Sequence, residues 1–164
     1  MLFRSCAWLF SRFTGLPFVD AASLVAFDAQ GEIDLVKTQY QFSALHAGYA
    51  RAVIPGFYGA APDGRIRTFP RNGSDITGAL CAAGTGSDLY ENWSDVPGLM
   101  TADPALDPTA AVVPRISYAA MRRLAEQGVP VLHPDSLSPV ARAGIPTRLR
   151  CTTAPDAPGT LITG

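Results

Sequence analysis

The sequence predicts an α/β fold, a sandwich of helices around a mostly parallel sheet. Short apolar runs with the length of buried strands alternate along the chain with longer segments of helical periodicity. With 164 residues, of which 48% are hydrophobic and 16% charged, the chain can form one ordinary domain with its own core. Alternation of this kind is typical of helices that cover the faces of a parallel sheet.

The first segment, residues 2–13, is predicted to form a helix. Its apolar side chains recur at near-helical spacing, and Gly15 followed by Pro17 is a stop signal. Arg12 interrupts the apolar run, which is also too short to cross a bilayer. We therefore expect neither a secretory leader nor membrane association.

The part of the chain up to residue 68 is predicted to continue with strands and a further helix. A short apolar pattern favours a strand at 21–27, and helical spacing favours a helix at 42–52. The compact apolar run 52–57 suits a buried parallel strand, and the turn residues within 59–68 indicate a turn or hairpin.

A Gly-Ser-Asp turn at residues 73–75 precedes the small-residue segment 76–83. This pattern predicts a loop that opens a helix, with Ser74 or Asp75 as its N-cap. The first backbone N–H groups of a helix are unpaired, so such a terminus can bind an anion or a phosphate.

The second half of the chain repeats the alternation, and a glycine able to end a helix follows each helical segment. We expect a strand at 87–93, although its polar residues are unusual for a central strand, then helices at 117–127 and 133–142 and strands at 147–151 and 160–163.

Several short motifs follow one another in a fixed order, and this order resembles the C-terminal part of the catalytic domain of aspartate kinase, in the amino acid kinase family. The resemblance runs from about residue 8 to the end of the chain. The motifs are Leu16–Ala21, Val53–Gly59, Arg71–Asp75, Trp93–Gly98, Thr101–Pro104, Pro114–Tyr118, Val131–Pro134, Gly144–Pro146 and Gly159–Ile162.

The resemblance implies a three-layer α/β sandwich of the amino acid kinase type that is incomplete at its N-terminus. The family's opening Lys-Phe-Gly-Gly-Thr-Ser segment, which supplies a phosphate-binding lysine, is missing from the 164 residues, and so are regulatory domains. Residues 1–164 are thus expected to be a partial amino acid kinase domain without a regulatory domain.

The resemblance also implies a reaction, the transfer of a phosphoryl group from ATP with Mg²⁺ to the side-chain carboxylate of L-aspartate. This step serves lysine, threonine and methionine synthesis. By residue matching, Asp75 is the catalytic-site aspartate, Arg71 and Ser74 bind substrate, and Gly73, Ser94 and Asp95 bind nucleotide. Two other interpretations stay open, a solvated loop arginine for Arg71 and an N-cap carboxylate for Asp75. His133 is interpreted as a helix-start residue and not as a general base.

Departures from the family pattern indicate weakened catalysis. Asn72 replaces a loop glycine, Met100 a tyrosine, Ala105 an arginine and Pro130 a lysine, and Lys37 is the only lysine of the chain. Asn tolerates left-handed backbone angles, so the loop is expected to survive. Two hypotheses follow: an aspartate kinase component that is not competent as this chain alone, and a non-catalytic kinase-like nucleotide-binding or interaction module or decayed fragment.

Composition bears on partners and location. The formal net charge of −1 gives no basic surface for nucleic acid. Three distant cysteines, an odd number, predict reduced and mostly buried thiols with neither a disulfide framework nor a zinc site. We expect a cytoplasmic protein without a bound metal. The resemblance implies that the first helix packs on the missing half of the domain and leaves side chains such as Trp8 and Phe10 exposed here, so we expect self-association or pairing with a complementary kinase half.

Overall fold

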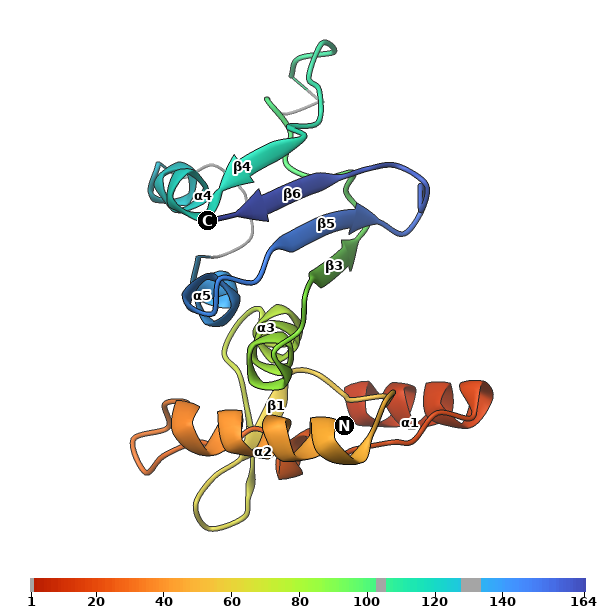
Figure 1. The fold of residues 1–164 in the computed structure, drawn as a ribbon, viewed down its shortest axis with the longest axis vertical. Helices are drawn as coiled ribbons and strands as arrows, with labels where there is room; N and C mark the ends of the chain where they lie inside the picture. Colours follow the sequence, from red (N-terminus) through yellow and green to blue (C-terminus); the bar gives the residue numbers. More distant parts are fainter. Residues whose placement is uncertain (1, 103–105, 128–133) are drawn as a thin grey trace. The chain divides into compact units, whose positions relative to one another are not determined.

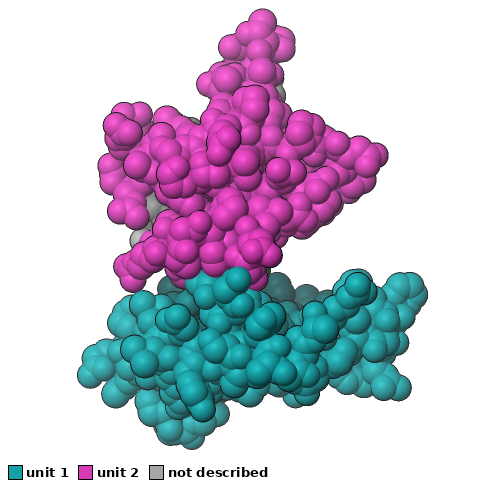
Figure 2. All heavy atoms as spheres, viewed as in Figure 1, with its two compact units in different colours: residues 1–86 teal, residues 87–164 magenta. Residues whose placement is uncertain are grey.

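The computed structural model describes residues 2–102, 106–127 and 134–164. The chain folds into two compact units, residues 1–86 and residues 87–164, shown in teal and magenta in Figure 2. Each unit is described by itself below. None of the described helices has the length and apolar character needed to cross a membrane.

Unit 1 is built from helices and one short hairpin (Figure 1). Its elements are α1 (Leu2–Thr14), the 3-10 helix η1 (Ala21–Ser23), α2 (Leu35–Gly48), β1 (Tyr58–Ala60), β2 (Ile66–Thr68) and α3 (Gly73–Thr85). The two strands pair antiparallel, with Tyr58 opposite Thr68, so the hairpin predicted at 59–68 is confirmed.

The core of unit 1 lies where α2 and α3 pack against the chain that follows η1. Phe42 of α2 is fully buried, and Leu80 of α3 is 5% exposed. The cluster consists of Leu24, Val25, Phe27, Phe42, Phe69 and Leu80. Asp34 caps α2, because its carboxylate accepts a hydrogen bond of 2.9 Å from the backbone N–H of Lys37.

Three predictions for unit 1 need correction. The helix predicted at 42–52 is α2, which begins at Leu35 on the Asp34 cap and ends at Gly48. Residues 21–27 are not a strand, because the Asp20 side chain accepts a hydrogen bond from the backbone N–H of Ala22 and starts η1. The segment 52–57 makes one isolated parallel bridge, from Val53 to Phe18, in place of a strand.

Unit 2 has a four-stranded sheet with helices α4 (Tyr118–Glu126) and α5 (Pro134–Arg142). The strands are β3 (Tyr90–Ser94), β4 (Arg115–Ser117), β5 (Thr147–Cys151) and β6 (Thr160–Thr163), in the order β3-β5-β6-β4. The β3-β5 and β4-β6 pairs are parallel, whereas β5 and β6 are antiparallel. The sheet is therefore mixed and mostly parallel, which confirms the predicted α/β class.

Local sequence explains several boundaries in unit 2. The strands predicted at 147–151 and 160–163 coincide with β5 and β6. The Ser117 hydroxyl accepts a hydrogen bond of 3.1 Å from the backbone N–H of Ala120 and so caps α4. The polar strand β3 lies at an edge of this sheet, where polar residues are tolerated. The predicted start of the second helix, His133, lies outside the described residues.

The packing of α2 on α3 depends on a glycine. A Cβ at Gly84 would lie 2.5 Å from the Phe42 Cβ, whereas a Cβ at Gly48 would meet nothing within 4 Å. We predict that Gly84→Ala lowers the free energy of unfolding by about 1–3 kcal/mol through overpacking. The matched change Gly48→Ala should leave stability equal or slightly higher. Urea unfolding measures both, and equal stability of the two variants would contradict the packing described.

Candidate functional site

The N-terminus of α3 is organised by Asn72. This residue is the N-cap, its φ of 50° lies in the left-handed region, and its side chain makes no capping hydrogen bond. The prediction that Ser74 or Asp75 is the N-cap is therefore wrong, since the helix begins at Gly73 and both residues lie in its first turn. The expected survival of the loop is confirmed, because Asn adopts this left-handed conformation at modest cost.

Gly73 permits a close approach between two sequence motifs. A Cβ at this position would lie 2.8 Å from the Phe57 Cα and 3.0 Å from the Phe69 Cβ. The buried Thr77 hydroxyl donates to the Gly73 carbonyl at 2.6 Å and accepts from the Phe57 N–H at 3.2 Å. The segment 53–59 and the turn 71–75 are thus held against each other in unit 1. We call residues 71–75 the α3 turn.

Phe57 has an unusual backbone conformation at this contact. Its φ of 86° is rare for a bulky residue and costs about 1–3 kcal/mol. Its carbonyl accepts a 3.0 Å hydrogen bond from the Phe69 N–H, and its ring stacks on Phe3 of α1 at 4.8 Å between centroids. Strain of this kind persists only where the surroundings enforce it, and it concentrates at functional sites.

The polar groups of the α3 turn are accessible. Arg71 and Ser74 are exposed, and Asp75 is partly buried. The backbone N–H groups in the first turn of a helix favour negative charge, and a guanidinium adds a planar donor for a carboxylate or a phosphate. The α3 turn therefore combines the groups needed to bind an anion with one carboxylate, Asp75.

The second predicted motif ends β3 in unit 2. The carbonyl of Ser94 accepts hydrogen bonds from the N–H and the hydroxyl of Thr152, at 2.8 and 3.0 Å, and its own hydroxyl accepts from the N–H of Val96 at 3.2 Å. Asp95 is exposed. The Leu99 N–H donates to the buried Thr160 hydroxyl at 2.9 Å, so the loop is tied at both ends.

The predicted site residues thus fall into two groups. Gly73, Ser74 and Asp75 form one turn with Arg71 in unit 1, and Ser94 and Asp95 adjoin each other in unit 2. Among the departures from the family pattern, Met100 makes an isolated bridge with Val112, while Ala105, Pro130 and His133 lie outside the described residues.

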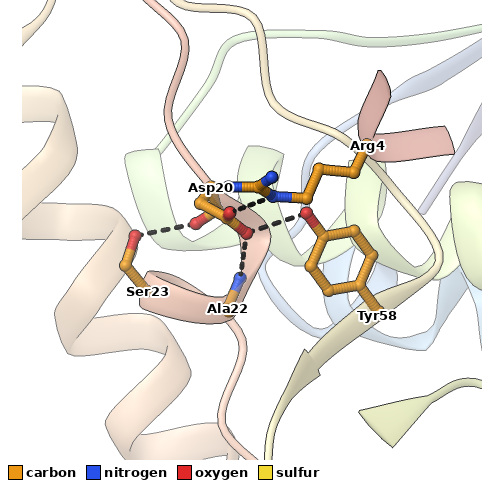
Figure 3. Close-up of polar contacts among 5 residues, drawn as sticks. All are labelled: Arg4, Asp20, Ala22, Ser23 and Tyr58. Carbon is orange, nitrogen blue, oxygen red and sulfur yellow. Dashed lines mark hydrogen bonds and ion pairs between the residues drawn. The ribbon is translucent and has the colours of Figure 1, made fainter. Parts of the chain in front are cut away.

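A polar cluster centred on Asp20 was not predicted (Figure 3). The Asp20 carboxylate accepts hydrogen bonds from Arg4 Nε at 2.6 Å, from the Tyr58 hydroxyl at 2.7 Å and from the Ala22 N–H at 3.1 Å. Sequence reasoning used Asp20 only as part of a family motif. The partners come from α1 and β1, and nothing in the local sequence indicates these pairings.

Burial and hydrogen bonding shift the pKa values of Asp20 and Tyr58 in this cluster. Burial alone would raise the pKa of Asp20, but the hydrogen bonds from Arg4, Tyr58 and Ala22 outweigh it and hold that pKa below its ordinary value. Burial, followed by the hydrogen bond to Asp20, raises the pKa of Tyr58 far above its ordinary value. The cluster is thus an ionised carboxylate that joins α1, η1 and β1.

The thiols and carboxylates of the described residues show no resident metal site. No group of three or more His, Cys, Asp or Glu side chains in these residues could hold a metal ion. All three cysteines are free. Cys151 is buried and Cys81 is partly buried, but Cys6 in α1 is exposed, so the expectation of mostly buried thiols is wrong for Cys6. Burial raises the pKa of Cys81 to about 11.

Comparisons with known proteins agree on one family. The model of the amino acid kinase family matches residues 6–151. Aspartokinase 3 of Bacillus subtilis is 35% identical over 142 residues, which are 86% of this chain and 31% of that protein. The crystal structure of Clostridium acetobutylicum aspartate kinase matches with a TM-score of 0.91 and 39% identity, over 96% of this chain and 36% of that one.

A further solved structure, Escherichia coli aspartokinase III in complex with aspartate and ADP, matches with a TM-score of 0.84 and 29% identity. The match covers 96% of this chain and 38% of the Escherichia coli chain. The chain therefore spans about a third of the length of these relatives. The amino acid kinase fold predicted from the sequence is confirmed.

The Asp20 cluster makes stability depend on pH. Since the pKa of Asp20 is lower in the folded chain, its stabilisation is complete above about pH 4 and is lost as the pH falls through the folded-state pKa. We predict that Asp20→Asn lowers the free energy of unfolding by about 1–2 kcal/mol at neutral pH. The difference from the wild type should shrink towards pH 3 in urea titrations.

The control for this prediction is Asp63→Asn, because Asp63 forms an exposed ion pair of 2.6 Å with Arg65 in the same unit. Exposed pairs contribute little, so this variant should change stability much less. A deficit in Asp20→Asn that stays constant with pH would show that the carboxylate charge is not responsible.

Proposed function

On the premise that this chain belongs to the amino acid kinase family, we propose that it contributes part of an aspartate kinase site. The reaction is phosphoryl transfer from ATP to the side-chain carboxylate of L-aspartate, and the 164 residues alone are not competent for it. The observation that carries this proposal is the α3 turn, where a helix N-terminus, an arginine and an aspartate lie in one short, firmly held segment.

In this proposal the α3 turn binds the negatively charged groups of the substrates. The guanidinium of Arg71 pairs with a carboxylate of L-aspartate, to which its planar fork is suited. The backbone N–H groups of Gly73 and Ser74 stabilise the charge that is carried on the oxygen atoms during transfer. The absence of a side chain at Gly73 keeps the first helical turn pressed on Phe57, which fixes these donors in place.

Ser94 and Asp95 are assigned to the nucleotide. Ser94 is the last residue of β3, which pairs in parallel with β5, and Asp95 follows it. Ligands of α/β proteins bind beyond the carboxyl ends of such strands. Mg²⁺ enters as part of the nucleotide substrate, since this ion usually takes one or two protein carboxylates together with phosphate oxygens. Asp75 supplies a carboxylate of the required kind, and the metal would neutralise phosphate charge. Asp75 holds the cations of the site near the transferred group.

The proposed step forms a bond between a carboxylate oxygen of L-aspartate and the γ-phosphorus of ATP, while the bond from that phosphorus to the bridging oxygen of ADP breaks. The nucleophile is already ionised at neutral pH, so no general base is required. Positioning and charge neutralisation therefore account for most of the catalysis. The product, an acyl phosphate, belongs to lysine and threonine synthesis, in line with a cytoplasmic enzyme.

A non-catalytic kinase-like module is the second candidate function, and the distribution of cations favours it. Lys37 is the only lysine among the 164 residues. It is exposed in the first turn of α2 and belongs to none of the family motifs. Ala105 and Pro130 stand where family members carry an arginine and a lysine, so part of the electrostatic stabilisation expected near the nucleotide is missing from these residues. We therefore propose weak nucleotide binding by this chain alone.

The first test concerns turnover. The chain alone should give no aspartyl phosphate, trapped as its hydroxamate, with Mg-ATP and L-aspartate. Adding a separately expressed N-terminal kinase segment should restore turnover, and Asp75→Ala should abolish it. The control Asp63→Ala, at an exposed aspartate of the β1-β2 turn, should keep full turnover. Turnover by the isolated monomer would contradict the proposal of an incomplete site.

The second test concerns Asn72. Its left-handed φ of 50° suits glycine better, and the residue directly precedes the first turn of α3. We predict that Asn72→Gly leaves the free energy of unfolding within about 1 kcal/mol of the wild type and strengthens Mg-ATP binding several-fold. Isothermal titration calorimetry measures the affinity. Weaker binding by the glycine variant would mean that the Asn72 side chain itself contacts the nucleotide.

A further inference from the structure

The sheet of unit 2 carries a row of charged residues on one face. The register places Arg115 of β4 and Arg148 of β5 on the two sides of Leu161 in β6, and it places Glu91 of β3 opposite Arg148. Residues directly opposite each other on paired strands project from the same face of a sheet. The row therefore crosses four neighbouring strands, whose order Figure 1 shows.

Arg150 extends this face along β5. Side chains alternate between the two faces of a strand, so Arg150 projects on the same side as Arg148, and Trp93 lies opposite it on β3. The Arg150 Cζ atom lies 4.6 Å from the centre of the Trp93 ring, and Arg150 Nη1 donates to the Glu91 carboxylate at 3.0 Å. We call four residues of this face the arginine face: Arg115, Arg148, Arg150 and Glu91.

Helix α4 packs on the other face of the sheet. Thr147 precedes Arg148 and is fully buried, and its hydroxyl forms a hydrogen bond of 2.8 Å with the hydroxyl of Tyr118, the first residue of α4. Ile162, which follows Leu161, is also fully buried. Because neighbouring residues of a strand project to opposite faces, the arginine face points away from α4.

Arg148 lacks a counterion within the part of the chain that the structure describes. The residue is partly buried, and its Nε atom is buried without a hydrogen-bond partner. Glu91 lies directly opposite, but its ion pair of 3.0 Å is formed with Arg150. A donor that is withdrawn from water without a partner is unfavourable, and an absent ion is one explanation for it. Arg148 therefore retains donor capacity for an anion.

The charge and spacing of the arginine face fit a phosphate group. Three positive charges and one negative charge leave a net charge of +2, and a phosphomonoester carries roughly −1.5 to −2 at pH 7. Arg115 and Arg148 lie two strands apart, which corresponds to about 10 Å between their Cα atoms. Two planar guanidinium groups that approach from opposite sides can share the oxygen atoms of one tetrahedral phosphate, whereas a single carboxylate is satisfied by one of them.

We propose that the arginine face binds a phosphate group, either free phosphate or the monoester of a small molecule. Arg115 and Arg148 bind the phosphate oxygens above Leu161, and Glu91 holds Arg150 beside them. This site uses neither the α3 turn nor the residues assigned to the nucleotide, Ser94 and Asp95. Its occupation requires no phosphoryl transfer, so it goes beyond the proposed function and does not depend on it.

The test is an amide NMR titration of the 164-residue chain at constant ionic strength, with inorganic phosphate in one series and phenyl phosphate in another. Saturable shifts are expected for the amides of Arg148 and Leu161, and the tighter of the two ligands identifies free or esterified phosphate as the source. Arg148→Gln and Arg115→Gln should each weaken this binding roughly tenfold or more. Arg115 is exposed, so its variant keeps the test valid if Arg148→Gln fails to fold.

The matched control is Arg142→Gln, because Arg142 is an exposed arginine in the last turn of α5 in the same unit. It should bind phosphate like the wild type. Equal weakening by this control would overturn the assignment to the arginine face, as would unchanged affinity in Arg148→Gln and Arg115→Gln. Shifts confined to residues 71–75, or no saturable binding of either compound, would also overturn the proposal.

Discussion

The close approach between Phe57 and the first turn of α3 is the contact on which unit 1 depends. Two glycines make it possible, because a Cβ at Gly73 would lie 2.8 Å from the Phe57 Cα and a Cβ at Gly56 would lie 3.0 Å from the Ser74 Cα. Thr77 closes the contact with two hydrogen bonds. The chain accepts a left-handed Phe57 and a left-handed Asn72 to reach this geometry. What results is a helix N-terminus whose donors are fixed before any ligand arrives.

The same contact connects the candidate site to the rest of unit 1. Phe57 stacks on Phe3, and the next residue, Tyr58, donates to Asp20, which also holds Arg4. Phe57 therefore contacts α1 directly through a stacked ring, whereas Tyr58 is connected to α1 through Asp20, which forms the ion pair with Arg4. Phe57 thus connects α1 with the first turn of α3, since it stacks on Phe3 and lies against Gly73.

The sequence predicts secondary structure correctly in this chain where neighbouring residues alone determine it. The strands β5 and β6 and the hairpin follow from apolar runs and turn residues alone. The strand expected at 52–57 fails because Pro55 has no N–H to donate and Phe57 leaves the extended conformation. The cap of α3 shifted to Asn72 because a left-handed residue there lets Gly73 enter the helix against Phe57.

The candidate site could be predicted only in part, for the same physical reason. The residues of the α3 turn adjoin one another in sequence, so their motif is readable. The Asp20 cluster joins residues 16 and 38 positions apart, and no periodicity or motif signals such pairs. The exposure of Trp8 and Phe10 on α1 was expected from the resemblance, whereas the stacking of Phe3 on Phe57 required the structure.

The most direct measurement of the central claim is an amide NMR titration of the chain, in complex with its complementary kinase segment, with L-aspartate and Mg-ATP. If the α3 turn is the anion-binding element, the amides of Ser74 and Asp75 shift with L-aspartate, and those of Gly73, Ser94 and Asp95 shift with Mg-ATP. If ligand binding saturates and shifts amides elsewhere, but the amides of residues 71–75 do not shift with either L-aspartate or Mg-ATP, the α3 turn is not the anion-binding element.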